Sequence, residues 1–415
     1  MENPRVWFRS ISLENVRSFG SKQTIYFTED GTENSPVARW NVLLGDNGTG
    51  KTTVLKGLVV SVQNQQAVVK TGVDLTEFWR NKGEIGGATV EVMLDDQNNK
   101  ISSLFKIDYA SDGPKNSSYF RFLRNYEIDV AVFAYNAARR ISTTGISEDS
   151  TDPISNFFGE ESKLTNAEEW LIQADYLSYK DSKYKKRYEI IDKVLSKLFE
   201  GEVYYIFIEL KAGVPKVFFS TVYGDVNLHE LSLGYKTTIA WMVDFAKGLL
   251  DHYPGSPNPL AEPAVCLVDE IDLHLHPKFQ RNIIKFLTDT FPNTQFIVTA
   301  HSSLVVQAAE DYQANLIVLK REGNETVVTN GLDVRNWRVD QILSSDLFEG
   351  ISPRAPEAEA KMARRRHLLV QDSLSSEEKT ELAELERELD IVSVSDTWES
   401  VKTLDIIRKA MLNQE

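Results

Sequence analysis

The segment GDNGTGKTT, Gly45 to Thr53, constrains this chain more than any other feature. It fits the phosphate-binding pattern G-x-x-x-x-G-K-[ST]. It also has the context that the pattern requires, because RWNVLLG before it reads as a strand and KTTVLKGLVVSVQNQQ at its end reads as a helix. A chance match of a glycine-rich loop is the alternative. The strand, loop and helix predict an α/β fold with a phosphate site at the start of the helix.

The residue types in this loop explain how it would bind phosphate. Glycines, among them Gly48 and Gly50, let backbone N–H groups converge on phosphate oxygens, and the helix dipole adds to the attraction. Lys51 would bring a positive charge to the β- and γ-phosphates, and the Thr52 hydroxyl would be a ligand for Mg²⁺. Thr53 completes the motif. We therefore predict a nucleotide with Mg²⁺ as the cofactors.

A second motif, AVCLVDEID, ends a buried-type apolar run in two carboxylates, Asp269 and Glu270. Beside a P-loop, this is a Walker B arrangement. Asp269 would hold Mg²⁺ through water, and Glu270 would polarise the attacking water. A buried strand followed by solvated acids is the alternative. The two motifs together predict nucleotide hydrolysis, with Thr52 and Asp269 as metal residues and Glu270 as a catalytic residue.

Two further motifs flank the Walker B segment. LSLGYKTT, Leu231 to Thr238, stands directly before a predicted helix, where Ser232 and the backbone of Gly234 would meet a γ-phosphate. A serine N-cap is the ordinary alternative for Ser232. FIVTAHSS places His301 at the end of a buried-type strand, and a lone histidine there is more often structural. Their positions in the motif order favour the functional interpretation of both.

The order P-loop, LSxG, apolar-DE, TAH resembles the ABC ATPase superfamily. The start LENVRSFGS, Leu13 to Ser21, and DEIDLHLHP, Asp269 to Pro277, resemble its RecF, SMC and OLD branch. Within that branch, the chain is most similar to the compact ATPases of bacterial anti-phage systems, such as the PARIS and Septu ATPases. The resemblance covers roughly residues 9 to 345.

Further site residues follow from this resemblance alone. It implies that Arg17 and Ser18 lie near the nucleotide, that Asn47 contacts phosphate, and that His301 contacts the γ-phosphate. LSLGYK resembles the ABC signature, with Leu233 in place of its first glycine.

The chain departs from the superfamily pattern at two other places. His276 falls where transporters have the D-loop aspartate. No Q-loop glutamine is evident, and in AYNAARR, residues 134 to 140, either Asn136 substitutes for it or a strand ends in solvated arginines.

The resemblance also implies an assembly. In ABC ATPases the signature of one subunit completes the ATP site of another, so we expect a homodimer or higher homo-oligomer with ATP and Mg²⁺ between the subunits. It implies an ATPase that acts as sensor and scaffold of an anti-phage complex and holds and releases a separate effector, a nuclease or toxin. A phage protein is the expected trigger, and nucleic acid is not required.

Two other roles compete with this one. A RecF- or SMC-like DNA-repair ATPase that clamps duplex DNA is the main alternative. A transporter subunit is disfavoured by LENVRSFGS, by the HLHP segment and by the missing Q-loop glutamine. OLD-type nucleases carry a Toprim domain with an Asp-x-Asp cluster, and the residues after His301 contain no such cluster. We therefore expect the nuclease activity to come from a partner.

Composition limits the remaining possibilities. The 415 residues carry a formal charge of −15, which argues against a surface covered in nucleic acid. One cysteine, Cys266, indicates a reducing compartment, and no apolar run is long enough to span a bilayer. A cytoplasmic protein without a membrane partner is the prediction.

Local charge and histidine clusters have two interpretations each. Basic groups near residues 183–187 and 364–366 would contact nucleic acid or, as we favour, form solvated helix faces. His274 and His276 with Asp272 suggest a metal, but the lack of a nearby cysteine or third histidine disfavours zinc.

The predicted architecture is α/β. It comprises a mixed central sheet with the P-loop and Walker B strands, an antiparallel β region and a helical insertion at about 145–200. We assign residues 1–345 to the ATPase domain and 346–415 to a helical C-terminal region for oligomer or partner contacts.

Overall fold

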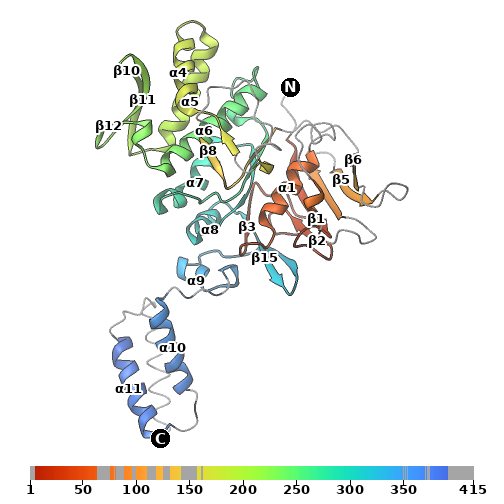
Figure 1. The fold of residues 1–415 in the computed structure, drawn as a ribbon, viewed down its shortest axis with the longest axis vertical. Coiled ribbons are helices and arrows are strands. Elements are labelled where there is room, and N and C mark those ends of the chain that lie inside the picture. Colours follow the sequence, from red (N-terminus) through yellow and green to blue (C-terminus); the bar gives the residue numbers. More distant parts are fainter. Residues whose placement is uncertain are drawn as a thin grey trace. The chain divides into compact units, whose positions relative to one another are not determined.

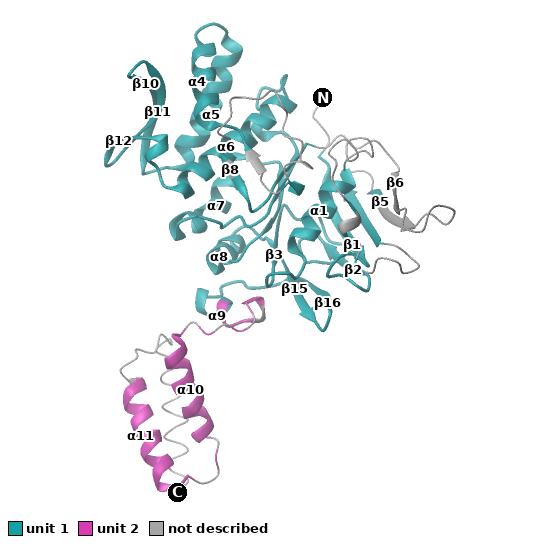
Figure 2. Ribbon diagram, in the orientation of Figure 1, with its two compact units in different colours: residues 1–342 teal, residues 343–415 magenta. Residues whose placement is uncertain are grey.

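The computed structural model describes residues 5–62, 75–78, 80, 88–95, 100–109, 118–124, 131–141, 157–159, 162–348, 350, 352, 354–369, 371 and 374–390. The chain divides into two compact units, residues 1–342 and 343–415, coloured teal and magenta in Figure 2. The described strands all lie in the first unit, and the described helices of the second form a hairpin.

A six-stranded sheet forms the centre of the first unit, in the order β16-β15-β3-β14-β13-β7. Neighbouring strands from β15 to β7 are parallel, and β16 is antiparallel to β15. All residues of β3, β13 and β14 are buried, which explains their continuous apolar runs. The strands are β3 (Trp40–Leu44), β7 (Val132–Tyr135), β13 (Ala264–Val268), β14 (Thr294–Thr299), β15 (Asn315–Glu322) and β16 (Glu325–Leu332).

An antiparallel sheet in the order β2-β1-β4-β5-β6 forms the second layer. Its strands are β1 (Trp7–Glu14), β2 (Gln23–Tyr26), β4 (Ala88–Asp95), β5 (Lys100–Tyr109) and β6 (Ser118–Arg124). The helix that follows the P-loop, α1 (Lys51–Val62), packs against β1, β4 and β5 on one side and against β14 on another (Figure 1). This explains why α1 is apolar on most of its circumference.

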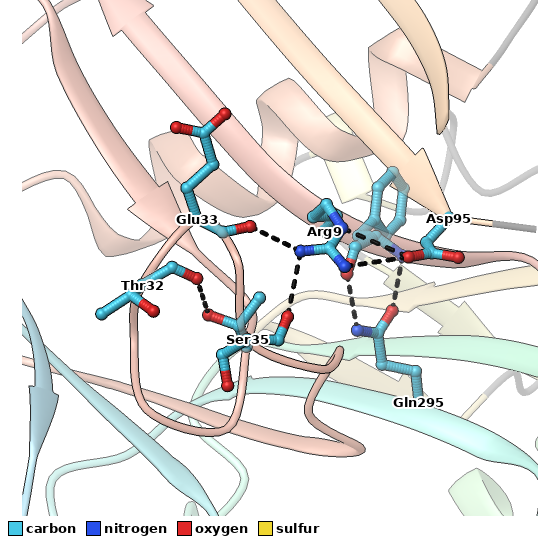
Figure 3. Close-up of polar contacts among 8 residues, drawn as sticks. Arg9, Thr32, Glu33, Ser35, Asp95 and Gln295 are labelled. Atoms are coloured by element: carbon cyan, nitrogen blue, oxygen red, sulfur yellow. Dashed lines mark hydrogen bonds and ion pairs between the residues drawn. The ribbon is translucent and has the colours of Figure 1, made fainter. Parts of the chain in front are cut away.

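Two polar side chains hold β1 in place (Figure 3). The Gln295 amide, on β14, accepts from the backbone N–H of Phe8 and donates to its carbonyl, both at 2.8 Å. Arg9 donates to Asp95 Oδ2 at 3.1 Å and to the carbonyls of the adjacent loop. Because the Gln295 amide is buried, its pairing fixes β1 against β14, while Arg9 holds β1 to β4 and to the loop before β3.

Helices and a small sheet form the rest of the first unit (Figure 1). Helix α6 packs against α4, α5 and the short pair β8–β9, and α7 packs against α8. The helices are α4 (Ala167–Ser178), α5 (Ser182–Leu198), α6 (Leu233–His252), α7 (Pro277–Thr290), α8 (Ser303–Glu310) and α9 (Val339–Leu343), with short 3-10 turns η1 (Leu75–Phe78), η2 (Leu228–Glu230) and η3 (Pro259–Ala261). The strands are β8 (Arg139–Ile141), β9 (Ser162–Leu164) and the antiparallel β10 (Val203–Lys211), β11 (Val214–Thr221) and β12 (Gly224–Asn227).

The predicted α/β class is confirmed, with a mixed central sheet and an antiparallel β region. Within the predicted helical insertion at about 145–200, the structure has helices α4 and α5. Before α4, residues 162–164 form β9, which pairs with β8. Residues 145–156 lie outside the described residues.

The second unit contains α10 (Pro356–Leu369) and α11 (Ser376–Asp390), with a 3-10 turn η4 (Asp346–Phe348) before them. A capping box begins α11, because Ser375 and Glu378 exchange hydrogen bonds of 2.9 and 3.2 Å. Ion pairs join the two helices: Lys361–Glu388, Arg364–Glu381 and Arg365–Glu386.

Candidate functional site

A cavity of about 290 Å³ lies where β3, β13 and β14 end. Every residue that lines it belongs to the predicted site: Arg17, Ser18, Asn47, Gly48, Gly50, Lys51, Thr52, Thr53, Asp269, Glu270 and His301. Parallel strands bring their carboxyl ends to one edge of a sheet, and ligands bind there. The structure therefore brings together residues that are up to about 280 positions apart in sequence.

The loop between β3 and α1 requires glycine at two positions. Gly45 has a φ of 137°, and a Cβ there would lie 2.2 Å from the carbonyl oxygen of Leu319. Gly50 has a φ of 98°, and its Cβ would lie 2.5 Å from Ser18 Oγ. These close contacts hold the loop against β15 and against the turn of Ser18, so the N-terminus of α1 faces the cavity.

Lys51 lies inside this loop and is only 7% exposed. Its Nζ donates to the carbonyls of Gly45 at 2.6 Å and Asp46 at 2.9 Å. Burial lowers the pKa of Lys51, while the nearby Asp269 and Glu270 carboxylates act in the opposite direction. The ammonium group thus places a poorly solvated positive charge on the cavity wall.

Oxygen atoms suited to Mg²⁺ also meet at the cavity. The Thr52 hydroxyl donates to Asp269 Oδ2 at 2.7 Å, and Thr299 donates to Asp269 Oδ1 at 2.7 Å. A hydroxyl and a carboxylate side by side match the hard oxygen ligands that Mg²⁺ takes together with phosphate and water. Thr299 was not among the predicted site residues, although it lies in the TAH motif. Its hydroxyl binds the Asp269 oxygen that Thr52 does not contact.

Glu270 lines the cavity with its backbone in the left-handed region, at a φ of 52°. Its N–H donates to Thr299 Oγ1 at 2.7 Å. A non-glycine residue with this φ is uncommon and persists where its surroundings hold it.

Arg139, 8% exposed, lies behind Glu270 and is missing from the predicted site. Its guanidinium donates to the carbonyls of Asp269 at 2.6 Å, Glu270 at 2.9 Å and Asn136 at 3.2 Å. Burial lowers its pKa to about 10, which leaves it charged at neutral pH. The interpretation of this segment as a strand end with solvated arginines is therefore wrong for Arg139.

Asn136, the candidate for the Q-loop position, is buried. Its Nδ2 donates to the carbonyl of Gly159 at 3.3 Å, and it is absent from the lining of the cavity.

Arg17 and Ser18 reach the cavity from the turn after β1. Ser18 Oγ donates to the carbonyl of Thr49, inside the P-loop, at 3.3 Å. Arg17 has a φ of 46°, and its N–H donates to the carbonyl of Phe78 at 2.9 Å. The antiparallel sheet thus contributes the side of the cavity that the P-loop leaves open.

His301 is exposed at the junction of β14 and α8. Its backbone N–H donates to Asp272 Oδ2 at 2.9 Å, and the following residue, Ser302, caps α8. The carboxylate of Asp272 therefore fixes the backbone from which the imidazole enters the cavity.

Ser232 and Gly234 do not line the cavity. They lie at the start of α6, on a small separate pocket with His274 and His276. A Cβ on Gly234 would lie 2.2 Å from the carbonyl oxygen of His274, so glycine permits this close contact. The exposed Ser232 is the N-cap residue of α6 but makes no side-chain capping bond.

The remaining histidine and arginine clusters have structural contacts. His276 Nδ1 accepts from the N–H of Lys278 at 3.3 Å and caps α7. Across the described residues, no group of three His, Cys, Asp or Glu side chains is arranged to hold a metal. Arginines of both basic clusters are in ion pairs: Arg187 with Asp251, Arg364 with Glu381, Arg365 with Glu386 and Arg366 with Glu359.

Within the part of the chain that the structure describes, no helix has the length and apolar character needed to cross a bilayer.

Comparison with known proteins places these observations in a family. Residues 40–307 match the family described as "AAA domain, putative AbiEii toxin, Type IV TA system". Septu protein PtuA of Bacillus mycoides (strain KBAB4) is 25% identical over 389 residues, which cover 92% of this chain and 50% of that protein. The retron Vc95 probable ATPase of Vibrio cholerae is 44% identical over 93 residues, 22% of this chain and 18% of that protein.

Among solved structures, the SmcHead bound to the C-winged helix domain of ScpA aligns with a TM-score of 0.48 at 15% identity, over 79% of this chain and 98% of that one. The chain spans half the length of the PtuA protein and about a fifth of the retron ATPase.

Proposed function

Because the chain belongs to the family described as "AAA domain, putative AbiEii toxin, Type IV TA system", we propose that it is an Mg²⁺-dependent ATPase. We propose further that it is the sensor and scaffold subunit of a bacterial anti-phage defence complex. The observation that carries the first proposal is the single cavity whose lining consists entirely of P-loop, Walker B, TAH and N-terminal motif residues. The second rests on the family resemblance and on the similarity to Septu PtuA and to retron ATPases.

The chemistry follows from the cavity walls. Backbone N–H groups of the loop and the Lys51 ammonium bind the phosphates of ATP, and Asn47, Gly48, Gly50 and Thr53 line the same surface. Thr52 and Asp269 would hold Mg²⁺, whose charge would offset that of the phosphate oxygens. Glu270 accepts a proton from the attacking water, and His301 contacts the γ-phosphate from the other side.

A second copy of the chain completes the site in this proposal. Ser232 and Gly234 lie at the N-terminus of α6, outside the cavity of their own chain, so they serve the nucleotide of a neighbouring chain in a head-to-tail pair. ATP binding closes the pair and hydrolysis opens it. The nucleotide thereby biases an equilibrium between two states of the assembly, which suits a subunit that holds and releases an effector.

The Glu270→Gln variant tests the ATPase. We expect it to bind ATP with wild-type affinity, to remain dimeric in ATP, and to release phosphate at least about 100-fold more slowly, because the amide is a poor proton acceptor. Phosphate release and ATP titration measure the two properties separately. Unchanged turnover would remove Glu270 from the role of base.

The same variant tests the defence role when it is expressed with the neighbouring genes and held in ATP. Native mass spectrometry should find a large assembly that contains a second polypeptide, a nuclease or toxin. A dimer without a partner, together with salt-dependent binding of duplex DNA, would instead favour the RecF- or SMC-like DNA-repair ATPase.

A further inference from the structure

In the backbone turn after β13, residues 269–271, each N–H group donates a hydrogen bond. Asp269 N–H donates to the Tyr135 carbonyl at 2.8 Å, and Ile271 N–H donates to the Thr299 carbonyl at 3.0 Å. Between them, Glu270 N–H donates to Thr299 Oγ1 at 2.7 Å. The strands on both sides of β13, namely β7 and β14, thus hold the N–H side of the turn.

Arg139 holds the carbonyl side of the same turn. Its Nη1 donates to the Asp269 carbonyl at 2.6 Å, and its Nη2 donates to the Glu270 carbonyl at 2.9 Å. The planar guanidinium presents two N–H groups in a fixed geometry and so can hold two consecutive carbonyls at once. The compact ammonium of lysine lacks this fork.

Arg139 has no place in the nucleotide cavity, because it is buried and is absent from the cavity lining. One face of its guanidinium lies 5.6 Å from the ring centroid of Trp241, which is buried on α6. The side chain is thus fixed by the carbonyls on one side and by an aromatic ring on another. Helix α6 also carries Gly234 in its first turn, and Ser232 is its N-cap residue.

The turn needs such support because Glu270 has a φ of 52°. This conformation is unfavourable for a residue with a Cβ and persists where hydrogen bonds and packing impose it. The direction of the Glu270 side chain depends on this backbone conformation. A small displacement of a catalytic group lowers the rate strongly without a matching loss of binding.

We infer that Arg139 is a positioning residue that fixes the Glu270 backbone and thereby sets the rate of the hydrolytic step, an inference that rests on the ATPase activity proposed above. Arg139 does not touch the nucleotide. It acts on the turnover number through Glu270 and leaves the affinity for ATP unchanged.

The test compares Arg139→Lys with Arg39→Lys. Arg39 is a half-buried arginine that also donates to three carbonyls, those of Thr288, Phe291 and Thr294, at 2.6 to 3.2 Å. It lies just before β3, at the opposite end of that strand from the P-loop. Both substitutions remove a guanidinium fork from backbone carbonyls, so both should lower thermal stability.

We expect Arg139→Lys to lower kcat by about 100-fold and to leave the dissociation constant of ATP within about threefold of the wild-type value. Arg39→Lys should leave both quantities within about threefold, because its carbonyls are far from the turn. A folded Arg139→Lys protein with wild-type kcat would overturn the inference. An equal loss of kcat in both variants would also overturn it, because the effect would then be one of stability.

A double variant separates positioning from general damage. If Arg139 acts through Glu270, then Glu270→Gln combined with Arg139→Lys should hydrolyse ATP no more slowly than Glu270→Gln alone. Multiplication of the two losses would contradict the inference. A wild-type rate for Glu270→Gln alone would instead refute the proposed base, so the two failures are distinguishable.

A further variant keeps the inference testable if Arg139→Lys does not fold. Trp241→Leu removes the ring against the guanidinium and leaves the donors of Arg139 in place. It should lower kcat about tenfold with ATP affinity unchanged, and an unchanged kcat in the folded protein would overturn the inference.

Discussion

Lys51 is 7% exposed, and its ammonium group is oriented by two carbonyls of the P-loop. Its charge is therefore partly desolvated and available to phosphate oxygens. We expect Lys51→Ala to weaken ATP binding at least about 100-fold, since hydrogen bonds to charged groups contribute roughly 1.5–3 kcal/mol each. Isothermal titration with ATP measures this change.

Lys56→Ala is the matched control for Lys51→Ala. Lys56 lies on the same helix, α1, but is absent from the cavity lining, and its Nζ lies 4.8 Å from the ring centroid of Phe158. Its replacement should leave ATP affinity unchanged. Wild-type affinity in Lys51→Ala would contradict the assignment of the P-loop.

Residues that belong to a motif with fixed spacing could be predicted from the sequence. Residues that support those motifs through tertiary contacts could not. Lys51, Asp269 and Glu270 were predicted because the chemistry of phosphate and Mg²⁺ dictates their types. Arg139 was missed because an arginine after a short strand is solvated in most proteins. Its burial results from the packing of α6 against β8 and of β13 against β7, and both α6 and β13 are far from Arg139 in sequence.

At the scale of elements, length and periodicity determined what could be predicted. The buried strand β13 and the helix α1 are continuous, mainly apolar runs that adjoin the recognisable DE and GKT motifs, and both were predicted. Strand β9 has three residues, and its parallel pairing with β8 is a tertiary contact. Strand β12 has four residues and directly follows the turn after β11, so it offers too short a pattern for the sequence to indicate a strand.

The contact between α6 and the turn of His274 gives a prediction at the scale of elements. A Cβ on Gly234 would lie 2.2 Å from the His274 carbonyl oxygen, so Gly234→Ala must displace the start of α6 or this turn. We expect a loss of about 1–3 kcal/mol in the free energy of unfolding, as for other overpacked sites. Thermal or chemical denaturation measures it.

Gly255→Ala is the control for this prediction. A Cβ on Gly255 would meet nothing within 4 Å, and its φ lies outside the left-handed region. Gly255→Ala should be neutral or slightly stabilising, because alanine restricts the unfolded chain. Equal stability of the two variants would show that α6 is free to move away from His274.

At the scale of the whole molecule, the predicted ATP-binding residues fall into two groups. One group lines the cavity, and the other, Ser232 and Gly234, lies at a separate pocket of the same unit. Ser232 and Leu233 are exposed, with Leu233 at 60%, so this end of α6 is accessible to another chain. In a symmetric pair, the cavity of each chain would meet Ser232 and Gly234 of the other chain, which gives two complete sites.

The C-terminal unit, residues 343–415, is the proposed site of contacts with other chains. Its described helices are joined by ion pairs at the surface, and exposed ion pairs contribute little to stability. Among its described residues, the buried apolar side chains are Leu347, Leu368 and Leu389. We therefore assign oligomer or partner contacts to this unit as a proposal.

Mixing two inactive variants tests the head-to-tail pair. Lys51→Ala removes the phosphate-binding charge, and Ser232→Arg blocks the start of α6 at little cost in stability, because Ser232 makes no capping bond. In a mixed pair, one site carries both defects, and the other combines an intact P-loop with an intact Ser232. We expect phosphate release by the mixture to rise to at most about a quarter of the wild-type rate, because half of random pairs are mixed and each has one intact site.

The controls for mixing are each variant alone and a mixture of Lys51→Ala with Glu270→Gln. Both of these defects lie in the cavity of the chain that carries them, so the mixed pair contains no intact site. Its rate should stay at the sum of the two separate variants. Native mass spectrometry shows whether Lys51→Ala and Ser232→Arg form mixed pairs. If mixed pairs form but hydrolysis does not recover, Ser232 does not serve the neighbouring site. Each chain would then have to hydrolyse ATP with the residues of its own cavity.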